Sequence, residues 1–192
     1  MKKLLALALT LALIAPCASA ASRVNRPNLM FNGHDSQVAM NLGMGTDAMW
    51  LLPFPAMPAP LAMFEVRYSH PNEFFRWPGR QNIGVVYLQG WGSDRRDWEW
   101  NSFTMPIFYL SQDITLFQTR NWYYGTGMGI GMQLRENDRI GTKLVFSFRL
   151  FMGRAISYNW NVELFMHHFS NGSTTANNYS YNFFGVGFLR NF

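Results

Sequence analysis

The chain of 192 residues contains little charge and almost no cysteine. Asp, Glu, Lys and Arg make up only 14% of it, against roughly a quarter of an ordinary soluble domain. Cys17 is the single cysteine, and the mean hydropathy is only −0.09. Beyond the amino terminus no apolar run reaches the length of a transmembrane helix, which needs about 20 residues. A multi-pass helical membrane protein is therefore excluded.

Aromatic residues, by contrast, are abundant, with 17 Phe, 8 Tyr and 7 Trp. An intrinsically disordered chain has far fewer, because it buries little surface. The chain is basic, but Lys2 and Lys3 account for part of this: without them 14 basic residues face 11 acidic ones, a net charge of +3. No polybasic patch remains to bind nucleic acid.

The amino terminus has the pattern of a secretory signal peptide. Lys2 and Lys3 precede the apolar stretch 4–14, and Ala18-Ser19-Ala20 has the small residues of a cleavage site. We expect residues 1–20 to be removed and residues 21–192 to form one domain, in which 21–36 is polar and irregular. Lipoprotein cleavage before Cys17 is the alternative, disfavoured by Pro16. Once residues 1–20 are removed, the mature chain contains no cysteine.

Apolar residues beyond position 60 recur with a period of two, as in β-strands. One face carries aromatic and aliphatic side chains and the other carries Gly, Ser, Arg and Glu, which is typical of a transmembrane barrel with its apolar face outward. The strands of a soluble β-sandwich or lipocalin also alternate, but their residues are not divided into a large apolar face and a small or charged one. The final residue, Phe192, resembles the outer-membrane assembly signal of Gram-negative bacteria. Residues 61–70 illustrate the alternation: the outward face is Ala62, Phe64, Val66 and Tyr68, and the inward face is Glu65, Arg67 and Ser69.

The fold class predicted from this pattern is all-β, an eight-stranded antiparallel transmembrane β-barrel of the outer membrane. Eight strands of about 9–12 residues fit the chain length, whereas twelve leave too little for the connections. The proline-rich stretch 53–60 is expected to be a loop. The expected strands are 37–49, 61–70, 81–91, 101–112, 121–134, 140–151, 160–170 and 181–192.

A barrel of eight strands has an interior that its own side chains fill, so a general porin is excluded. The acidic and basic residues of inward parity are expected to form an interior network of ion pairs and hydrogen bonds. These residues are Glu65, Arg67, Arg149 and Glu163. Any function must then lie on the outer wall or in the loops.

Three polar residues break the apolar rule of the outward face. His168 and Ser170 share the parity of Met166 on the seventh expected strand, and Asn182 shares that of Phe184 on the eighth. Unpartnered polar groups facing hydrocarbon are costly, because no water is there to bond with them. The two strands should form a hairpin, which would bring Asn182 to the level of His168 and Ser170.

A hydroxyl, an imidazole and a side-chain carbonyl in reach of one another suit a serine nucleophile activated by histidine. We expect His168 to take the proton of Ser170 and Asn182 to hold the imidazole in the useful tautomer. Asn171 and the amides near Gly172 and Ser173 are the expected oxyanion donors. The simpler alternative is a polar strand end at the level of the lipid headgroups.

Other candidates are weaker. His167 and Glu163 have inward parity, so we expect His167 to pack inside the barrel and Glu163 not to contact His168. Ser173 is an alternative nucleophile, but it lies in the expected loop. No spacing among the four histidines predicts a metal site, and no cofactor is expected.

The topology predicts the side of the membrane on which the site lies. With both termini in the periplasm, the loop 171–180 is extracellular and the three residues lie in the outer leaflet. That leaflet is lipopolysaccharide in Gram-negative bacteria, so an outward-facing esterase there would meet the acyl chains of lipid A.

The chain resembles the outer-membrane lipid A 3-O-deacylase family of the PagL type. The resemblance rests on the signal peptide, the small barrel, His-x-Ser-Asn ending the penultimate strand, and a third member twelve residues after the serine. It is weaker at Asp138-Arg139-Ile140-Gly141, placed in the expected sixth strand. It implies hydrolysis of the 3-O-linked acyl chain of lipid A, with lipopolysaccharide and the membrane as partners. A member of that family carries Glu at the third position, where this chain has Asn182, whose carbonyl can accept the imidazole N–H without adding a charge.

The motif also resembles that of outer-membrane phospholipase A, which has His-x-Ser-Asn-Gly and an Asn as third member. Phospholipase activity is therefore one alternative, although the chain is short for a twelve-stranded barrel. A small structural or adhesive barrel without enzymatic activity is the other. Whether the barrel forms a homodimer is left open.

Overall fold

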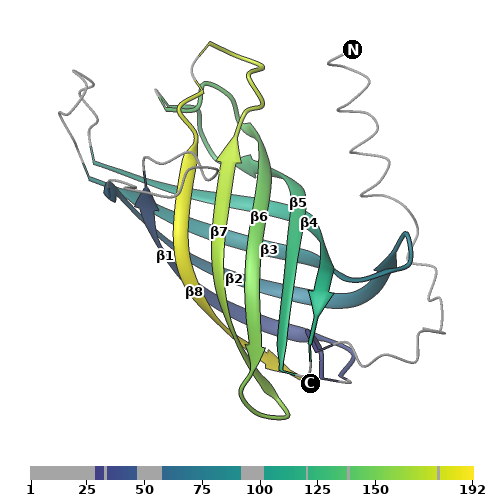
Figure 1. Ribbon diagram of the computed structural model, residues 1–192. Coiled ribbons are helices and arrows are strands. Elements are labelled where there is room, and N and C mark those ends of the chain that lie inside the picture. The colour runs from purple at the N-terminus through teal and green to yellow at the C-terminus, as the bar shows by residue number, and fades with distance from the viewer. Residues whose placement is uncertain are drawn as a thin grey trace.

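Eight antiparallel strands close into a β-barrel (Figure 1) in a computed structural model. The structure describes residues 29–32, 34–46, 58–91, 102–119, 121–137, 139–176 and 178–192. The expected signal peptide, residues 1–20, lies outside the described residues. The strands are β1 (Gln37–Thr46), β2 (Pro58–Phe74), β3 (Trp77–Gly90), β4 (Phe103–Gln118), β5 (Trp122–Gln133), β6 (Leu144–Ala155), β7 (Trp160–Ser170) and β8 (Tyr181–Asn191).

Each strand pairs with its neighbours in sequence, and β1 pairs with β8 to close the barrel. The loop 171–180 lies at the top of Figure 1 and the carboxyl terminus at the bottom. At that lower end Ser36 and Phe192 exchange backbone hydrogen bonds of 3.3 and 3.0 Å. We name the two ends the loop end, with loop 171–180, and the terminal end, with Ser36 and Phe192. Within the part of the chain that the structure describes, no helix is long and apolar enough to cross a membrane.

The prediction of eight strands is confirmed, but some bounds are wrong. The stretch 71–80, expected to be a connection, is mostly strand, because β2 and β3 meet at the two-residue turn Phe75-Arg76. Both turn residues have positive φ, 49° and 69°, which suits the twist of a hairpin. The sixth strand begins at Leu144 instead of 140, and the fourth extends to Gln118 instead of 112.

The proline-rich stretch is also not entirely a loop. Pro58 is the first residue of β2 and pairs with Thr46. Proline is tolerated as the first residue of a strand, because no ladder hydrogen bond from its backbone nitrogen is needed there. The expected extension of the first strand to residue 49, and positions 53–57 of the proline-rich stretch, lie outside the described residues.

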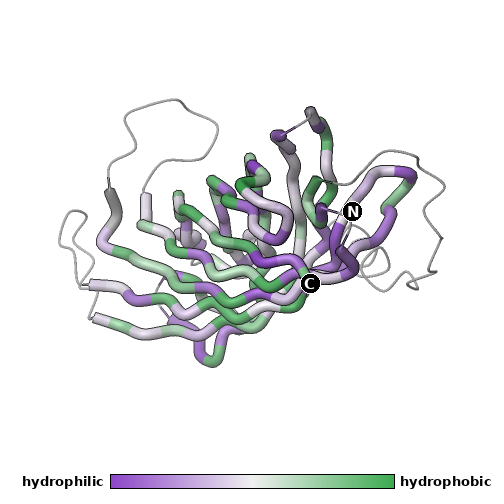
Figure 2. Tube along the Cα trace, turned by 90° about the horizontal axis from the view of Figure 1, so that it is seen from below, coloured by the Kyte–Doolittle hydropathy of each residue, from purple (hydrophilic) through white to green (hydrophobic). Residues whose placement is uncertain are grey.

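The outer wall is apolar, as the alternation predicts. Figure 2 shows apolar and polar residues alternating along the strand traces. On β1, the side chains of Met40, Leu42 and Met44 are 57%, 56% and 70% exposed, while Ala39 and Asn41 between them are completely buried. An outward apolar face on every strand is the surface that lipid requires.

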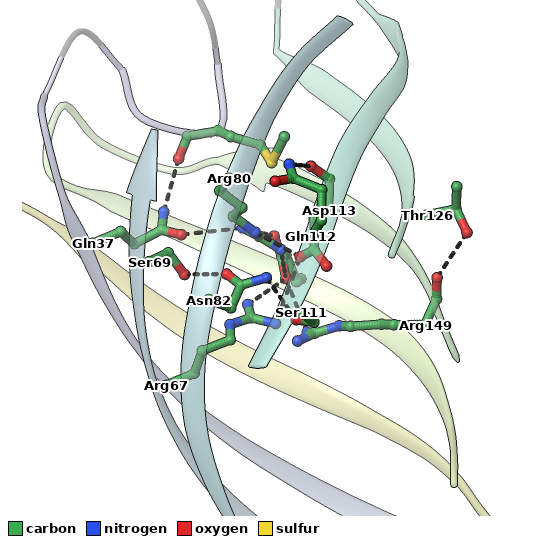
Figure 3. A network of polar contacts seen from close by, with 12 residues as sticks. Gln37, Arg67, Ser69, Arg80, Asn82, Ser111, Gln112, Asp113, Thr126 and Arg149 are labelled. Carbon is green, nitrogen blue, oxygen red and sulfur yellow. Dashed lines mark hydrogen bonds and ion pairs between the residues drawn. The ribbon is translucent and has the colours of Figure 1, made fainter. Parts of the chain in front are cut away.

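The expected interior network is present and larger than predicted. Glu163 accepts hydrogen bonds from Arg80, Arg149 and Arg67, the shortest being 2.8 Å from Arg80 Nη1. Arg80 Nε also donates to Asp113 Oδ2 at 2.8 Å. Figure 3 shows these arginines converging inside the barrel. Arg80 was not predicted as a member of the network, because it falls at the edge of the stretch wrongly assigned to a connection.

The interior also holds large aromatic side chains, which the expected polar and small lining did not include. Glycines on the neighbouring strands leave the space for them. A Cβ at Gly153 would collide with the ring of Tyr123, and one at Gly84 would collide with that of Tyr109. Tyr109 and Tyr123 donate to Glu65 and Glu163, so the aromatic and ionic parts of the core are joined.

The segment just before β1 closes the terminal end of the barrel. Met30 and Phe31 are buried in the core. The Met30 carbonyl accepts hydrogen bonds from Gln37 Nε2 at 2.7 Å and from Asn161 Nδ2 at 2.8 Å. Part of the stretch expected to be irregular therefore serves as a plug at this end.

Candidate active site

The candidate residues lie where β7 and β8 approach the loop end. His168 and Ser170 are half-buried and face outward, and β7 ends at Ser170. Two residues of the same strand face lie about 7 Å apart along it, a separation that an imidazole and a serine side chain can bridge. The outward parity predicted for both residues is confirmed.

His168 and Asn182 are directly opposite each other in the β7–β8 ladder. Their side chains are in contact, with His168 Nδ1 and Asn182 Oδ1 2.6 Å apart. An amide oxygen accepts only, so this contact places the proton of a neutral imidazole on Nδ1. The other ring nitrogen, Nε2, is then an acceptor, as a general base requires.

A third residue completes this chain of contacts. Asn182 Nδ2 lies 3.1 Å from Ser180 Oγ, the side chain two positions earlier. Ser180 was not among the residues predicted from the sequence. The sequence could have indicated Ser180, because it has the same parity as Asn182 and continues the outward face of β8 into the loop.

The three expected oxyanion residues belong to a tight turn after Ser170. Asn171 Nδ2 donates to Thr175 Oγ1 at 2.6 Å, and Ser173 N donates to Asn171 Oδ1 at 2.9 Å. Gly172, between them, has a φ of 63°, a conformation that glycine adopts without steric cost. Asn171 is completely buried, so its side chain organises the turn from within.

The connection between β5 and β6 holds loop 171–180 in place. Arg139 Nε donates to the carbonyl of Ser180, and the Tyr179 amide donates to the Arg139 carbonyl at 2.8 Å. Ile140 forms an isolated β-bridge with Asn178. Arg139, Ile140 and Gly141 therefore precede the sixth strand, in which they were wrongly expected, and Arg139 and Ile140 contact the loop. Asp138 lies outside the described residues.

A pocket opens in the outer wall beside His168 and Asn182. The side chains of Phe148, Leu150 and Met166, all of outward parity on β6 and β7, form its apolar part. Its lining residues are Thr46, Phe148, Leu150, Met166, His167, His168, Asn182 and Phe183.

The structure shows no contact of the weaker candidates with the side chains of His168 and Asn182 among the interactions of the described residues. His167 is buried inside the barrel, with Nδ1 3.4 Å from Glu65 Oε2, as predicted. Glu163 is in the interior network. Ser173 is exposed in the turn. Among the residues with described positions, no group of three or more His, Cys, Asp or Glu could hold a metal ion.

The profile of the family described as Lipid A 3-O-deacylase (PagL) matches residues 62–190. The chain belongs to this family. The match covers every strand from most of β2 to β8, including the hairpin that carries His168, Ser170 and Asn182.

Solved structures show the same fold as this PagL-family chain. The crystal structure of the outer membrane enzyme PagL is 12% identical, with a TM-score of 0.57, covering 81% of this chain and 99% of that one. The crystal structure of Neisserial surface protein A (NspA) is 12% identical, with a TM-score of 0.52, covering 82% and 97%. No curated protein matches the chain. The protein is thus an integral outer-membrane β-barrel of the PagL family.

Proposed function

We propose that this protein hydrolyses the 3-O-linked acyl ester of lipid A, with Ser170 as nucleophile, His168 as general base and Asn182 orienting the histidine. The observation that carries the proposal is the 2.6 Å contact between His168 Nδ1 and Asn182 Oδ1 on the outward face of the barrel. Membership of the lipid A 3-O-deacylase family supports the reaction class.

The reaction is that of a serine esterase. Ser170 Oγ attacks the ester carbonyl carbon while His168 Nε2 takes the hydroxyl proton. The tetrahedral intermediate collapses, the sugar oxygen leaves with the proton from His168, and the acyl group stays on Ser170. Water, deprotonated by the same imidazole, then releases the fatty acid and restores the serine.

Developing negative charge on the carbonyl oxygen needs donors close to Ser170. Asn171 Nδ2 and Ser173 N already donate within the turn. The backbone N–H of Gly172 is therefore the leading oxyanion donor of the three expected residues, and Asn171 and Ser173 hold the turn that presents it.

The surroundings of the site suit an acyl chain. Phe148, Leu150 and Met166 line the pocket beside His168 on the outer wall, so a chain in the same leaflet can enter sideways from lipid. With the loop end on the extracellular side, the pocket faces the leaflet that contains lipopolysaccharide.

The deciding experiment compares lipid A from cells that make the native protein or Ser170→Ala. Mass spectrometry should show loss of one 3-position acyl chain with the native protein and its retention with the variant. Equal deacylation by both would remove Ser170 as nucleophile. Ser157→Ala, an exposed serine at the terminal end, is the matched control and should behave like the native protein.

Phospholipase activity is the second candidate, favoured by the Asn in the third position of the triad. Purified protein offered phosphatidylethanolamine and lipid A side by side separates the two. Release of fatty acid from phosphatidylethanolamine alone would replace the deacylase proposal. Hydrolysis of neither lipid would favour a non-enzymatic barrel.

A further inference from the structure

A phenylalanine on the strand next to β7 flanks the candidate site. Phe146 lies directly opposite Ser170 in the β6–β7 ladder and is half-buried on the outward face. The Cβ atoms of such a pair are about 5 Å apart, so the Phe146 side chain stands beside the proposed nucleophile. Phe146 is not among the residues that line the pocket next to His168. Its place in the site is therefore separate from that pocket.

The Phe146 ring also reaches the turn that follows β7. A Cβ at Gly172 would lie 3.1 and 3.2 Å from the ring carbons Cδ2 and Cε2, closer than an ordinary contact between carbon atoms. Among the described residues outside 171–173, no other atom lies within 4 Å of that position. The ring therefore covers the side of Gly172 on which a side chain would stand.

Gly172 needs support from its surroundings, because glycine adopts positive and negative φ about equally well. Its φ in this turn is 63°. From within, the buried Asn171 holds the turn through Thr175 and the Ser173 amide. On the outward side the contact is the Phe146 ring. We infer that Phe146 is a positioning residue that keeps Gly172 in this conformation next to the nucleophile.

This role rests on the proposed function, in which the Gly172 N–H is the leading oxyanion donor. Among the described residues that N–H has no acceptor, so it is available to a carbonyl oxygen of the substrate. Without the ring, the bonds of Asn171 would remain but Gly172 could adopt other φ values. A misplaced donor lowers kcat, because the charge that it stabilises develops only in the transition state. KM should not change, since the acyl chain binds in the pocket beside His168.

Ordinary packing of the outer wall is the competing explanation for Phe146, and Phe148 provides the comparison. Phe148 is the next outward residue of β6 toward the terminal end, lies opposite His168 and lines the pocket. Phe148→Ala should raise KM, because it removes part of the place for the acyl chain. If the two phenylalanines were merely parts of one apolar surface, their Ala variants would change the same kinetic parameter.

The test measures kcat and KM for release of fatty acid from lipid A by the purified protein and its variants. Phe146→Ala should lower kcat about tenfold and leave KM unchanged, and Phe146→Tyr, which keeps the ring, should retain the native kcat. Phe188→Ala, on the outer wall near the terminal end, is the matched control and should change neither parameter. An unchanged kcat in Phe146→Ala, or a change of KM alone, would overturn the role of Phe146.

A double-mutant cycle with Gly172→Ala tests the contact itself. The strain of Ala at a φ of 63° is the same in both backgrounds, whereas the added methyl meets the ring only when Phe146 is present. Gly172→Ala should therefore lower kcat about ten times more in the native background than in the Phe146→Ala background. Equal losses in both would contradict the inference. An active native protein and an inactive Ser170→Ala would show in that case that the proposed function itself still holds.

Discussion

His168 and Asn182 form a directly opposed pair across β7 and β8, with Nδ1 and Oδ1 2.6 Å apart. The pair lies on the outward face of the barrel, where the next outward positions toward the middle of the two strands are the apolar Met166 and Phe184. A polar pair is tolerated there because each member satisfies the other. In the proposed mechanism the same contact prepares the imidazole for its role as a base.

The first prediction concerns the third member of the triad. Asn182→Ala removes the acceptor of the imidazole N–H and should lower kcat by about tenfold or more. Asn182→Glu supplies an acidic acceptor for the imidazole N–H and should preserve or raise activity. Release of fatty acid from lipid A measures both. Unchanged activity of the Ala variant would remove Asn182 from the site.

The pocket beside the site gives the second prediction. Met166→Trp should fill the apolar part of the pocket and lower kcat/KM about tenfold, because the acyl chain loses its place beside His168. Leu164→Trp is the matched control, since Leu164 is the outward residue two positions earlier on β7 and does not line the pocket. Similar losses in the two variants would show that the pocket does not hold the substrate.

The third prediction tests the interior network. Glu163→Gln keeps the size of the side chain but leaves Arg67, Arg80 and Arg149 without their shared negative charge. A broken buried ion pair costs about 3–5 kcal/mol, so the variant should unfold at clearly lower denaturant concentration in detergent. Glu73→Gln, on the exposed turn end of β2, should change the unfolding midpoint little. A native midpoint for Glu163→Gln would contradict a stabilising role of the network.

The plug at the terminal end gives the fourth prediction. Phe31 is only 2% exposed and packs in the core. Phe31→Ala should lower the free energy of unfolding by about 3 kcal/mol, because it leaves a cavity among the plug residues. Phe188→Ala, half exposed on the outer wall, should cost less. Deacylation by folded Phe31→Ala should remain at the native level, since the plug lies at the end of the barrel opposite the site.

Much of the architecture could be predicted from the sequence because a strand has a side-chain period of two. Once the strands are assigned, that period places His168 and Ser170 outward and Glu65 and Glu163 inward, before any coordinates are known. It also predicts that Asn182 shares a surface with His168. The bounds were harder to predict, since Pro58, Pro71 and Pro78 are residues typical of loops, although they lie within β2 and β3.

Only the tertiary structure decided the contacts that depend on strand register and on closure of the barrel. The pairing of His168 with Asn182 requires one particular alignment of β7 and β8. The contact of Arg139 with Ser180 joins residues 41 apart in the chain, and that of Arg80 with Glu163 joins residues 83 apart. Periodicity determines the face on which a side chain lies, but not its height on the wall or its partner across the interior. Those follow from how the strands are offset against one another when the sheet closes.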